Sequence, residues 1–448
     1  MVLNRRQWLT SMTAGLGAGA AGRTRGVEPA PAQSPARLRA PDGSVDWAAV
    51  RALFPLAPDW VHLAGFLLVS HPRPVAEAIE QFRRKLDADP VWIELAALSD
   101  SEGRPFRAIK SALAEYLGGR PDEISYALNT TSALAMAYHG LRIRPDQEIL
   151  TTEHDHYSHH ESIRYAAERS GCGVRYQALY DQGSRAGAQE MVARLERAIR
   201  PNTRAVGVTW VHSSTGVKIP LQPIAEAVAR ANRGRPQADR CLLIVDGVHG
   251  LGNQDVDIAR IGCDFFAAGT HKWLLAPRGT GFLWGRKDVW PELRPTIPSF
   301  DPDVQATWQA WMNRAPLPPT QAAFVSAGGF LAFEHFLAIP AALQLHRSLG
   351  RDRIAMRISE LNRAFREAAA SLARVRLHTP RDPELSAGIS CFEVSGLSAQ
   401  AVTSRLAAKK IRTNPSPYRA SYARVAAGVM NSIEDVETAV REIRRMAS

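Results

Sequence analysis

Short apolar segments alternate with longer helix-like segments over most of this 448-residue chain, and this alternation constrains the fold more than any other feature of the sequence. Short, continuous apolar segments are typical of strands that are buried on both faces of a parallel sheet. Together the segments predict an α/β fold in which a doubly wound, mostly parallel, seven-stranded sheet carries helices on both faces. The strands are predicted at residues 124–128, 148–152, 174–179, 204–210, 241–246, 264–268 and 281–284.

Helical periodicity occupies most of the intervals between the predicted strands. Beyond residue 329 we expect a helical stretch to residue 340, one long helix from 341 to 373, and then alternating strands and helices to residue 446. This last region predicts a smaller α+β C-terminal domain. The other helices are expected at residues 75–86, 107–117, 133–141, 189–198 and 221–231.

The chain is longer than one hydrophobic core usually supports, so more than one domain is expected. We predict a large domain followed by a small one, preceded by segments that serve export and linkage. The predicted regions are a signal peptide at 1–26, a linker rich in Pro and Ala at 27–44, a segment at 45–75 that packs on the small domain, a large domain at 76–328 and a small domain at 329–448.

The N-terminus carries the adjacent arginines Arg5 and Arg6, followed by a weakly apolar stretch of small residues from 11 to 22. That stretch is too short and too rich in Gly and Ala to cross a bilayer stably. The pattern predicts a twin-arginine signal, with the twin-arginine export machinery as a partner and a periplasmic or otherwise exported location. An amphipathic N-terminal helix or a basic tail is the alternative.

The net charge of +11 is spread along the chain rather than collected in one block. Basic residues do not alternate with aromatic ones in a stripe, so nucleic acid is not an expected partner. The four cysteines, Cys172, Cys241, Cys263 and Cys391, show no C-x-x-C spacing. We expect buried free thiols, although the sequence leaves a disulfide open.

Asp246 and Lys272 form the most informative pair of residues for function. Asp246 ends an apolar run, and Lys272 follows the next predicted strand within Thr270-His271-Lys272-Trp273. Because ligands of open α/β sheets bind at the carboxyl ends of the strands, both side chains are expected at one edge. A lysine amine can bind a carbonyl cofactor, and a carboxylate can keep a pyridine nitrogen protonated. The pair therefore predicts pyridoxal 5'-phosphate (PLP), the alternative being a surface lysine and a helix-capping aspartate.

Asn129-Thr130-Thr131-Ser132 lies between a predicted strand and a predicted helix. Hydroxyl groups and free backbone N–H groups at a helix N-terminus bind anions, so this motif predicts the phosphate site. An ordinary helix N-cap explains the same residues.

Residues 153–160, with the sequence EHDHYSHH, place several flat rings at the same edge of the predicted sheet. One of these rings could stack on a pyridine ring. The histidines also suggest a zinc site as an alternative, although the spacing matches no known metal motif.

Six motifs occur in the order found in class V PLP enzymes, which include cysteine desulfurases and isopenicillin N epimerases. The chain resembles this family from about residue 50 to its end. The motifs are Thr130-Thr131, Glu153-His154, Ser213-Ser214-Thr215-Gly216, Asp246-Gly247-Val248-His249, Thr270-His271-Lys272 and Arg278-Gly279-Thr280-Gly281.

The resemblance implies fold type I of the PLP-dependent transferases, a homodimer, and a role for each matching residue. Lys272 resembles the lysine of the internal aldimine, Asp246 the pyridinium partner and His154 the catalytic stacking ring. Arg424 resembles an arginine that grips the substrate α-carboxylate, although an arginine on the solvated side of a strand is the alternative. The other cofactor-binding residues implied are Thr130, Thr131, Ser213, His249, Thr270 and His271.

Two departures from the family pattern bear on function. Cysteine desulfurases carry a nucleophilic cysteine in the loop that corresponds to residues 411–418, and this loop contains no cysteine. Persulfide transfer is therefore not expected. Gly269 stands where the family often has a hydroxyl residue, so one phosphate contact is expected to shift to Thr270.

The predicted activity is chemistry at the Cα of an amino acid, or of an amino-acid group in a larger secreted molecule, by transamination, epimerisation or related tailoring. Exported members of the family that modify a siderophore provide the precedent for a secreted substrate. Two alternatives stay open: a binding protein that retains the fold without catalysis, and a zinc hydrolase that uses the histidines from His154 to His160.

Overall fold

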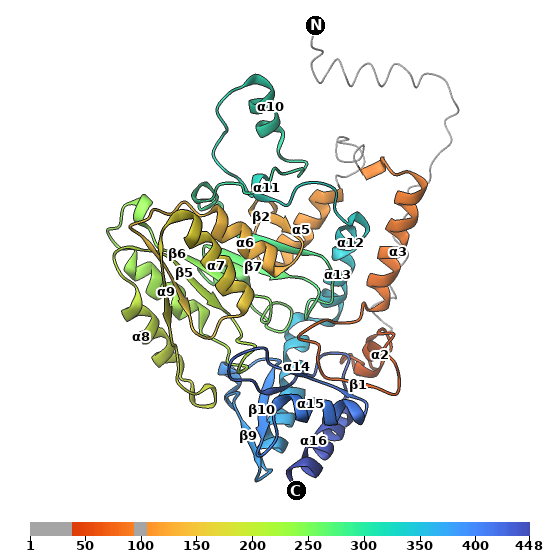
Figure 1. The fold of residues 1–448 in the computed structure, drawn as a ribbon. Helices are drawn as coiled ribbons and strands as arrows, with labels where there is room; N and C mark the ends of the chain where they lie inside the picture. Colours follow the sequence, from red (N-terminus) through yellow and green to blue (C-terminus); the bar gives the residue numbers. More distant parts are fainter. Residues whose placement is uncertain (1–37, 94–104) are drawn as a thin grey trace, which may run out of the picture. The chain divides into compact units, whose positions relative to one another are not determined.

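A seven-stranded sheet forms the centre of the larger part of the protein (Figure 1). The computed structural model describes residues 38–93 and 105–448. The strand order is β2-β8-β7-β6-β5-β3-β4, and β8 is antiparallel to both of its neighbours while the pairs from β7 to β4 are parallel. The predicted seven-stranded, mostly parallel α/β sheet is confirmed. Its strands are β2 (Ile124–Ala127), β3 (Glu148–Thr152), β4 (Gly173–Gln177), β5 (Thr203–Thr209), β6 (Leu242–Asp246), β7 (Phe265–Gly269) and β8 (Gly281–Gly285).

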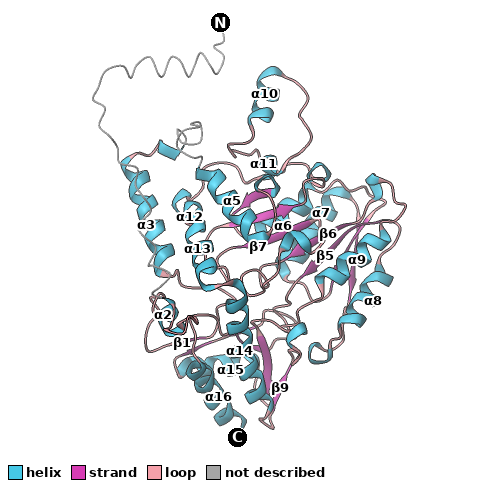
Figure 2. Cartoon of the chain, turned by 180° about the vertical axis from the view of Figure 1, so that it is seen from behind, coloured by secondary structure: helices cyan, strands magenta, loops and turns pink. Residues whose placement is uncertain are grey.

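Helices cover both faces of this sheet, as Figure 2 shows from behind. In β6, Leu243 and Val245 pack in one apolar cluster with helices α5, α8 and α9, while Leu242 and Ile244 pack in a second cluster with α6 and α7. Successive strand residues point to opposite faces, so a continuous apolar run is what a sheet covered on both sides requires. The helices are α5 (Pro105–Leu117), α6 (Thr130–Gly140), α7 (Tyr157–Ser170), α8 (Ala188–Ala198) and α9 (Leu221–Ala231).

A smaller antiparallel sheet follows, in the order β12-β13-β10-β9. Side chains of the helices α14 (Arg351–Ala370), α15 and α16 share one apolar cluster with this sheet. The N-terminal segment reaches the same region, because β1 (Val61–His62) pairs in parallel with β11 (Ile411–Arg412). The exact domain boundaries stay a prediction. The elements are β9 (Val375–Leu377), β10 (Ser390–Val394), α15 (Ala399–Ala408), β12 (Asn414–Pro415), β13 (Ala423–Val425) and α16 (Ile433–Ala447).

The long helix predicted at residues 341–373 is wrong, because two helices occupy this stretch. They are α13 (Ile339–Leu349) and α14 (Arg351–Ala370), and they are separated at Gly350. Gly350 has a φ of 94°, which favours glycine and ends a helix. The helical stretch predicted at 329–340 contains the five-residue α12 (Phe333–Leu337) and then the start of α13.

Two further helices precede the large sheet in sequence: α2 (Trp47–Arg51) and α3 (Arg73–Ala88). α3 packs against α12 and α13, and it begins with a proline at its first turn, a position where proline is favoured. Among the helices of the described ranges, none is long and apolar enough to cross a membrane.

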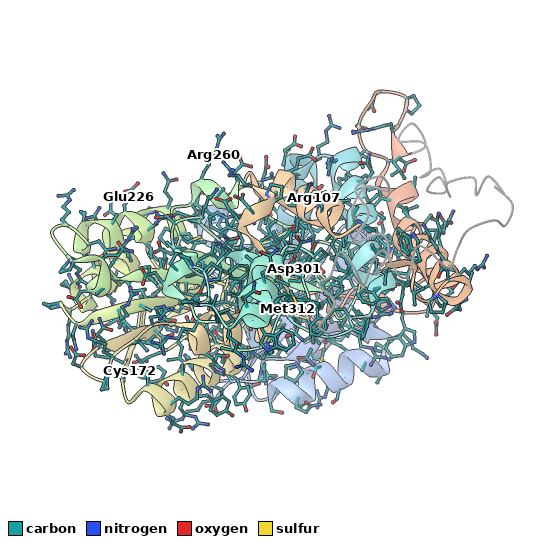
Figure 3. All side chains as sticks on the ribbon, turned by 90° about the horizontal axis from the view of Figure 1, so that it is seen from above. Arg107, Cys172, Glu226, Arg260, Asp301 and Met312 are labelled. Atoms are coloured by element: carbon teal, nitrogen blue, oxygen red, sulfur yellow. The ribbon has the colours of Figure 1, made fainter. Side chains whose placement is uncertain are left out.

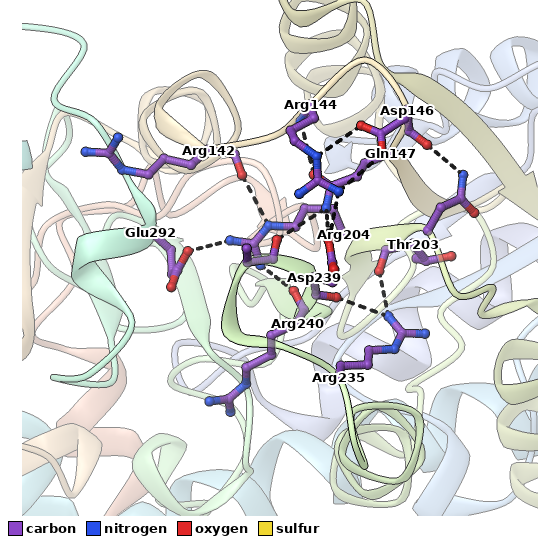
Figure 4. A network of polar contacts seen from close by, with 12 residues as sticks. Arg142, Arg144, Asp146, Gln147, Thr203, Arg204, Arg235, Asp239, Arg240 and Glu292 are labelled. Atoms are coloured by element: carbon purple, nitrogen blue, oxygen red, sulfur yellow. Dashed lines mark hydrogen bonds and ion pairs between the residues drawn. The ribbon is translucent and has the colours of Figure 1, made fainter.

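The amino-terminal ends of the central strands are held by a network of arginines and acids (Figure 4). Arg204 in β5 is 1% exposed and its guanidinium pairs with Glu292 at 2.5 Å. The same guanidinium donates to the backbone carbonyls of Arg142 and Arg240. A buried charge is tolerated because it is paired and hydrogen-bonded in this way. This edge of the sheet is therefore occupied by structural contacts.

Between β8 and the small domain, α10 (Gln305–Asn313) and α11 (Ala322–Val325) form an excursion that the sequence did not predict (Figure 1). Asp301, labelled with Met312 in Figure 3, anchors this excursion through a buried ion pair of 2.7 Å with Lys110 of α5. Trp311 and Phe330 are 77% and 78% exposed. Large apolar side chains this exposed are typical of surfaces that contact another molecule.

Candidate active site

A cavity of about 360 Å³ lies at the carboxyl ends of the central parallel strands. Thr209 and Asp246 end the neighbouring strands β5 and β6, and both line the cavity. The first residues of α6 form a second wall. Phe66, Pro417 and Arg424, from the N-terminal segment and the small domain, close the third side. The cavity is thus at the edge where ligands of open α/β sheets bind.

The structure brings Asp246 and Lys272 into this cavity, as the sequence predicted. Lys272 Nζ lies 3.4 Å from Nε2 of His249, which also lines the cavity. Val248 N donates to Asp246 Oδ1 at 3.2 Å, which fixes the carboxylate. Gly247 lies between these residues, and a Cβ there would be 1.7 Å from the Phe266 ring. Only glycine therefore lets this turn pack on β7.

Burial shifts the two titrating groups in opposite directions. It lowers the pKa of the Lys272 amine to about 8, while the charge of Asp246 acts against this change. Burial raises the pKa of Asp246 to about 6, and a hydrogen bond from Val248 and the charge of Lys272 act against that change. A lysine with a lowered pKa has more of the neutral amine that acts as a nucleophile or base.

The N-terminus of α6 forms the polar end of the cavity. Asn129 caps the helix, since its Oδ1 accepts from Ser132 N at 2.9 Å. Thr130 and Thr131 line the cavity at the first turn, and the Thr130 hydroxyl accepts from Gly269 N at 2.7 Å. The first N–H groups of a helix lack partners within it and attract anions. The helix cap therefore leaves this end of the cavity able to bind an anion.

The two residues before Lys272 have different surroundings. His271 lines the cavity, whereas the hydroxyl of the fully buried Thr270 bonds to Thr280 and is not among the cavity-lining groups. A Cβ at Gly269 would lie 2.8 Å from His271 Cε1 and 3.2 Å from Thr130 Oγ1. The absence of a hydroxyl residue at position 269 thus follows from tight packing. We expected Thr270 to make the phosphate contact that a hydroxyl residue at position 269 makes in the family. The geometry gives this expectation no support, because the Thr270 hydroxyl is bonded to Thr280.

The histidines of residues 153–160 do not all face the cavity. The His154 ring stacks on Tyr180 with centroids 3.8 Å apart, and its Nε2 accepts from Leu179 N at 3.2 Å. His154 is not among the residues that line the cavity, but His156 is. His156 caps α7 by accepting from Ser158 N at 3.2 Å. The structure therefore presents His156, rather than the expected His154, to the cavity.

The remaining histidines of the run serve other contacts. His159 Nε2 lies 2.6 Å from the Tyr138 hydroxyl, and His160 Nε2 lies 2.8 Å from the Thr152 carbonyl oxygen. In the described part of the chain, no three His, Cys, Asp or Glu side chains are grouped to hold a metal ion. The geometry therefore gives the zinc-hydrolase alternative no support.

Arg424 is buried, lines the cavity and has no carboxylate partner among the described residues. Its Nη1 donates to the Ser213 carbonyl at 3.2 Å, and its Nη2 donates to Asn414 Oδ1 at 2.7 Å. The guanidinium also lies 4.3 Å from the centre of the Phe66 ring. Because a buried charge without a counter-ion is costly, this arrangement favours an anionic ligand.

Sequence reasoning missed Phe66 and Thr209 as cavity residues. Thr209 is the last residue of β5, and its register partner on β6 is Asp246, so the strand-end rule could have found it. No local pattern indicates Phe66, which reaches the cavity from a segment far away in sequence. Ser213 lines the cavity as expected, with its hydroxyl 2.8 Å from that of Tyr418.

The chain matches the aminotransferase class-V family over residues 70–437. It belongs to this family. It is 30% identical to the isopenicillin N epimerase of Streptomyces clavuligerus over 358 residues, which cover 78% of this chain and 84% of that protein. The corresponding enzyme of Amycolatopsis lactamdurans is 28% identical over 364 residues, with 78% and 84% covered. A probable cysteine desulfurase of Aeropyrum pernix is 32% identical over 257 residues, with 55% and 58% covered.

Solved structures share the fold. A variant of the lyase C-DES with glycine covalently linked to its PLP cofactor has a TM-score of 0.76 at 20% identity, covering 89% of this chain and 99% of that one. The Escherichia coli cysteine desulfurase CsdA has a TM-score of 0.74 at 20% identity, covering 89% and 98%. The predicted fold type I and the predicted PLP cofactor are confirmed for this class-V protein.

The cavity of this class-V enzyme offers the polar groups that PLP requires. Among the described residues, His249 Nδ1, His271 Nδ1 and Arg424 Nε of the cavity lining are buried without hydrogen-bond partners, as is Oγ of Ser214, which follows the lining residue Ser213. Buried polar groups without partners are costly unless a ligand satisfies them. If PLP binds here, Asp246, Lys272 and the N-terminus of α6 would be the partners for its ring nitrogen, its aldehyde and its phosphate respectively.

We expect His156→Ala to weaken PLP binding by about fivefold or more, because a ring that faces the cofactor contributes about 1 kcal/mol or more of stacking energy. His154→Ala should change PLP affinity less, since its ring faces Tyr180. Equilibrium titration of the two variants with PLP, followed by absorbance, compares them directly. If His154→Ala loses more PLP affinity than His156→Ala, then His154 is the ring that stacks on the cofactor.

Proposed function

We propose that this class-V PLP enzyme acts at the Cα of an amino acid, or of an amino-acid group in a larger secreted molecule, by epimerisation, transamination or related tailoring. One observation carries the proposal: a half-buried lysine, a buried aspartate and a buried arginine, the arginine with no carboxylate partner among the described residues, line the same cavity. They are Lys272, Asp246 and Arg424. The lysine and the aspartate suit a cofactor ring, and the arginine suits the carboxylate of a substrate bound next to that ring.

Each side chain has a distinct task. Arg424 binds the substrate carboxylate and orients Cα towards Lys272. Lys272 removes the proton from Cα and can return it, because its lowered pKa provides neutral amine near pH 8. Asp246 holds the ring nitrogen protonated. When bound, PLP supplies an electron sink for the electron pair left at Cα.

The positions of the cysteines favour chemistry at Cα over sulfur transfer. All four cysteines are buried and unpaired. Cys391 is adjacent to Arg424 across the β10–β13 pair, but burial raises the pKa of its thiol to about 12. A thiol in this environment is a poor nucleophile. The relation to isopenicillin N epimerases over most of both chains also supports epimerase-type chemistry.

The test combines the absorption spectrum of the purified protein with exchange of the Cα proton in D2O. The wild type should show a visible band that borohydride bleaches, and it should exchange the Cα proton of its substrate amino acid at a rate that rises as the pH approaches about 8. Lys272→Ala should lose the bleachable band and at least about a hundredfold in exchange rate.

The outcomes separate the competing functions. Exchange with inversion at Cα indicates an epimerase, and exchange with accumulation of a keto acid indicates a transaminase. Release of sulfide from cysteine would support a desulfurase instead. A coloured protein that exchanges no proton from free or peptide-linked amino acids supports a binding protein, and a colourless protein that takes up no PLP contradicts the central assignment.

We further propose a homodimer, which the family resemblance implies and the exposed apolar side chains of α10 support. Trp311→Glu should lower the mass measured by light scattering from that of a dimer towards that of a monomer, because a charge would be buried in the contact. Met356→Glu is the control, since Met356 is 69% exposed on α14, a different part of the fold. A dimeric Trp311→Glu protein would place the contact elsewhere.

Export through the twin-arginine pathway stays a prediction, and its signal at residues 1–26 lies outside the described residues. Replacing Arg5 and Arg6 by lysine should retain the protein in the cytoplasm, as measured by cell fractionation, because the pathway recognises the arginine pair. Replacing Arg23 and Arg25 by lysine is the matched control and should leave export unchanged. Equal export of both variants would exclude this pathway.

A further inference from the structure

Tyr418 connects the small domain to residues of the cavity wall and has no role in the proposed function. It lies in the loop between β12 and β13, directly after the cavity-lining Pro417. Its hydroxyl lies 2.8 Å from the hydroxyl of Ser213, and its ring meets the His156 ring edge-on with centroids 6.0 Å apart. Ser213 and His156 both line the cavity. One side chain of the small domain thus contacts two cavity residues of the large domain.

Ser213 also holds Arg424, the residue proposed to bind the substrate carboxylate. Arg424 Nη1 donates to the Ser213 carbonyl oxygen at 3.2 Å. Its Nη2 donates to Asn414 Oδ1 at 2.7 Å and to the Pro415 carbonyl oxygen at 3.0 Å. These acceptors of the guanidinium therefore come from two segments, the turn at Ser213 and the strand β12. The hydrogen bond between Ser213 and Tyr418 joins the same two segments.

The three acceptors leave a defined part of the Arg424 guanidinium for a ligand. They use both N–H groups of Nη2 and one N–H group of Nη1. Among the described residues, Nε has no hydrogen-bond partner. Nε–H and the second N–H of Nη1 therefore remain, and these two donors can serve the two oxygens of a carboxylate. The positions of Ser213 and β12 decide which donors remain.

Hydrogen bonds within the loop connect the position of Tyr418 to that of β12. Ser416 N donates to the Tyr422 carbonyl oxygen at 2.8 Å, and Ser416 Oγ accepts from Tyr422 N at 2.9 Å. The Ser421 hydroxyl donates to the Ser416 carbonyl oxygen at 2.6 Å. Ser416 is buried and directly follows Pro415, the last residue of β12. Because such a network stiffens the loop, a contact at Tyr418 also restrains β12.

Restraint of this kind matters for a long side chain such as Arg424. An arginine loses rotamer entropy when it is ordered, and a ligand that orders it binds more weakly for that reason. Arg424 is already held before a ligand arrives, by its three acceptors and by the Phe66 ring, whose centre lies 4.3 Å from the guanidinium. A guanidinium that is held in advance binds a carboxylate more tightly.

We propose that Tyr418 is a positioning residue that, through its hydrogen bond to Ser213, holds Arg424 in the orientation that binds the substrate carboxylate. This inference rests on the role of Arg424 in the proposed function. Tyr418 is not among the residues that line the cavity, so its effect reaches the substrate through Arg424. The expected change is in the affinity for a carboxylate, and the affinity for PLP should be unchanged.

The experiment titrates the PLP-loaded protein at pH 8 with acetate, and in parallel with acetamide, which has a similar size but no charge. Burial and the positive charge of Arg424 lower the pKa of Lys272, so a carboxylate bound to Arg424 should change the visible cofactor band. Tyr418→Phe should raise the acetate concentration that gives half of this change by about threefold or more. Acetamide should leave the band of both proteins unchanged.

Three further variants test the path from Tyr418 to Arg424. Ser213→Ala removes the same hydrogen bond from its other side, so the double variant with Tyr418→Phe should lose no more acetate affinity than the weaker-binding single variant. Tyr422→Phe is the matched control: its ring stacks on His378 in the same loop, and the acetate response should equal that of the wild type. Arg424→Gln should abolish the response. If Tyr418→Phe does not fold, Ser213→Ala measures the same bond.

The outcomes distinguish this inference from the proposed function. An acetate affinity of Tyr418→Phe equal to that of the wild type would overturn the positioning role and leave the proposed function intact. Losses that add in the double variant would overturn it too, because the two halves of one hydrogen bond cannot act independently. A wild type that does not respond to acetate, or responds equally to acetamide, would contradict the role of Arg424 and this inference together. Absence of the visible band would contradict the proposed function as a whole.

Discussion

The burial of Asp246 and Lys272 in one cavity is the constraint on which the rest of the site depends. Removal from water disfavours a charged carboxylate and a charged amine alike, and it brings both pKa values closer to neutrality. The two neighbouring parallel strands β6 and β7 deliver these side chains to the same edge of the sheet. The tight contact between Gly247 and the Phe266 ring fixes the turn after Asp246.

The two edges of the sheet have different physical roles. At the amino-terminal ends, Arg204 is paired with Glu292 and its donors are satisfied by backbone carbonyls. At the carboxyl ends, Arg424 has backbone and amide partners but no carboxylate within the described chain, and four polar atoms in or near the cavity lack partners. Satisfied polar groups stabilise a fold, whereas unsatisfied ones gathered in a cavity provide binding energy for a ligand.

The positions of the strands along the chain, and the meeting of Asp246 and Lys272 at one edge of the sheet, could be predicted from the sequence, because both depend on short-range patterns. An apolar run of five residues is buried on both faces whatever its neighbours are, and its end lies at the ligand edge of a parallel sheet. The continuous helix predicted across position 350 failed, since helical periodicity on both sides concealed a glycine with positive φ. The excursion with α10 was also not predicted, because its helix lacks a clear apolar face towards the core.

The sequence by itself determined the fold class and singled out Lys272 and Asp246 as the candidate cofactor residues, since these follow from local periodicity and from chemistry that few residue types can provide. Only the tertiary structure decided which ring of the histidine run faces the cavity. His154 and His156 are two residues apart, and the turn after β3 directs one to Tyr180 and the other to the cavity. The tertiary structure also brought Phe66 and Arg424 together, although more than three hundred residues separate them in the chain. Such contacts depend on how distant segments pack, and no local pattern records them.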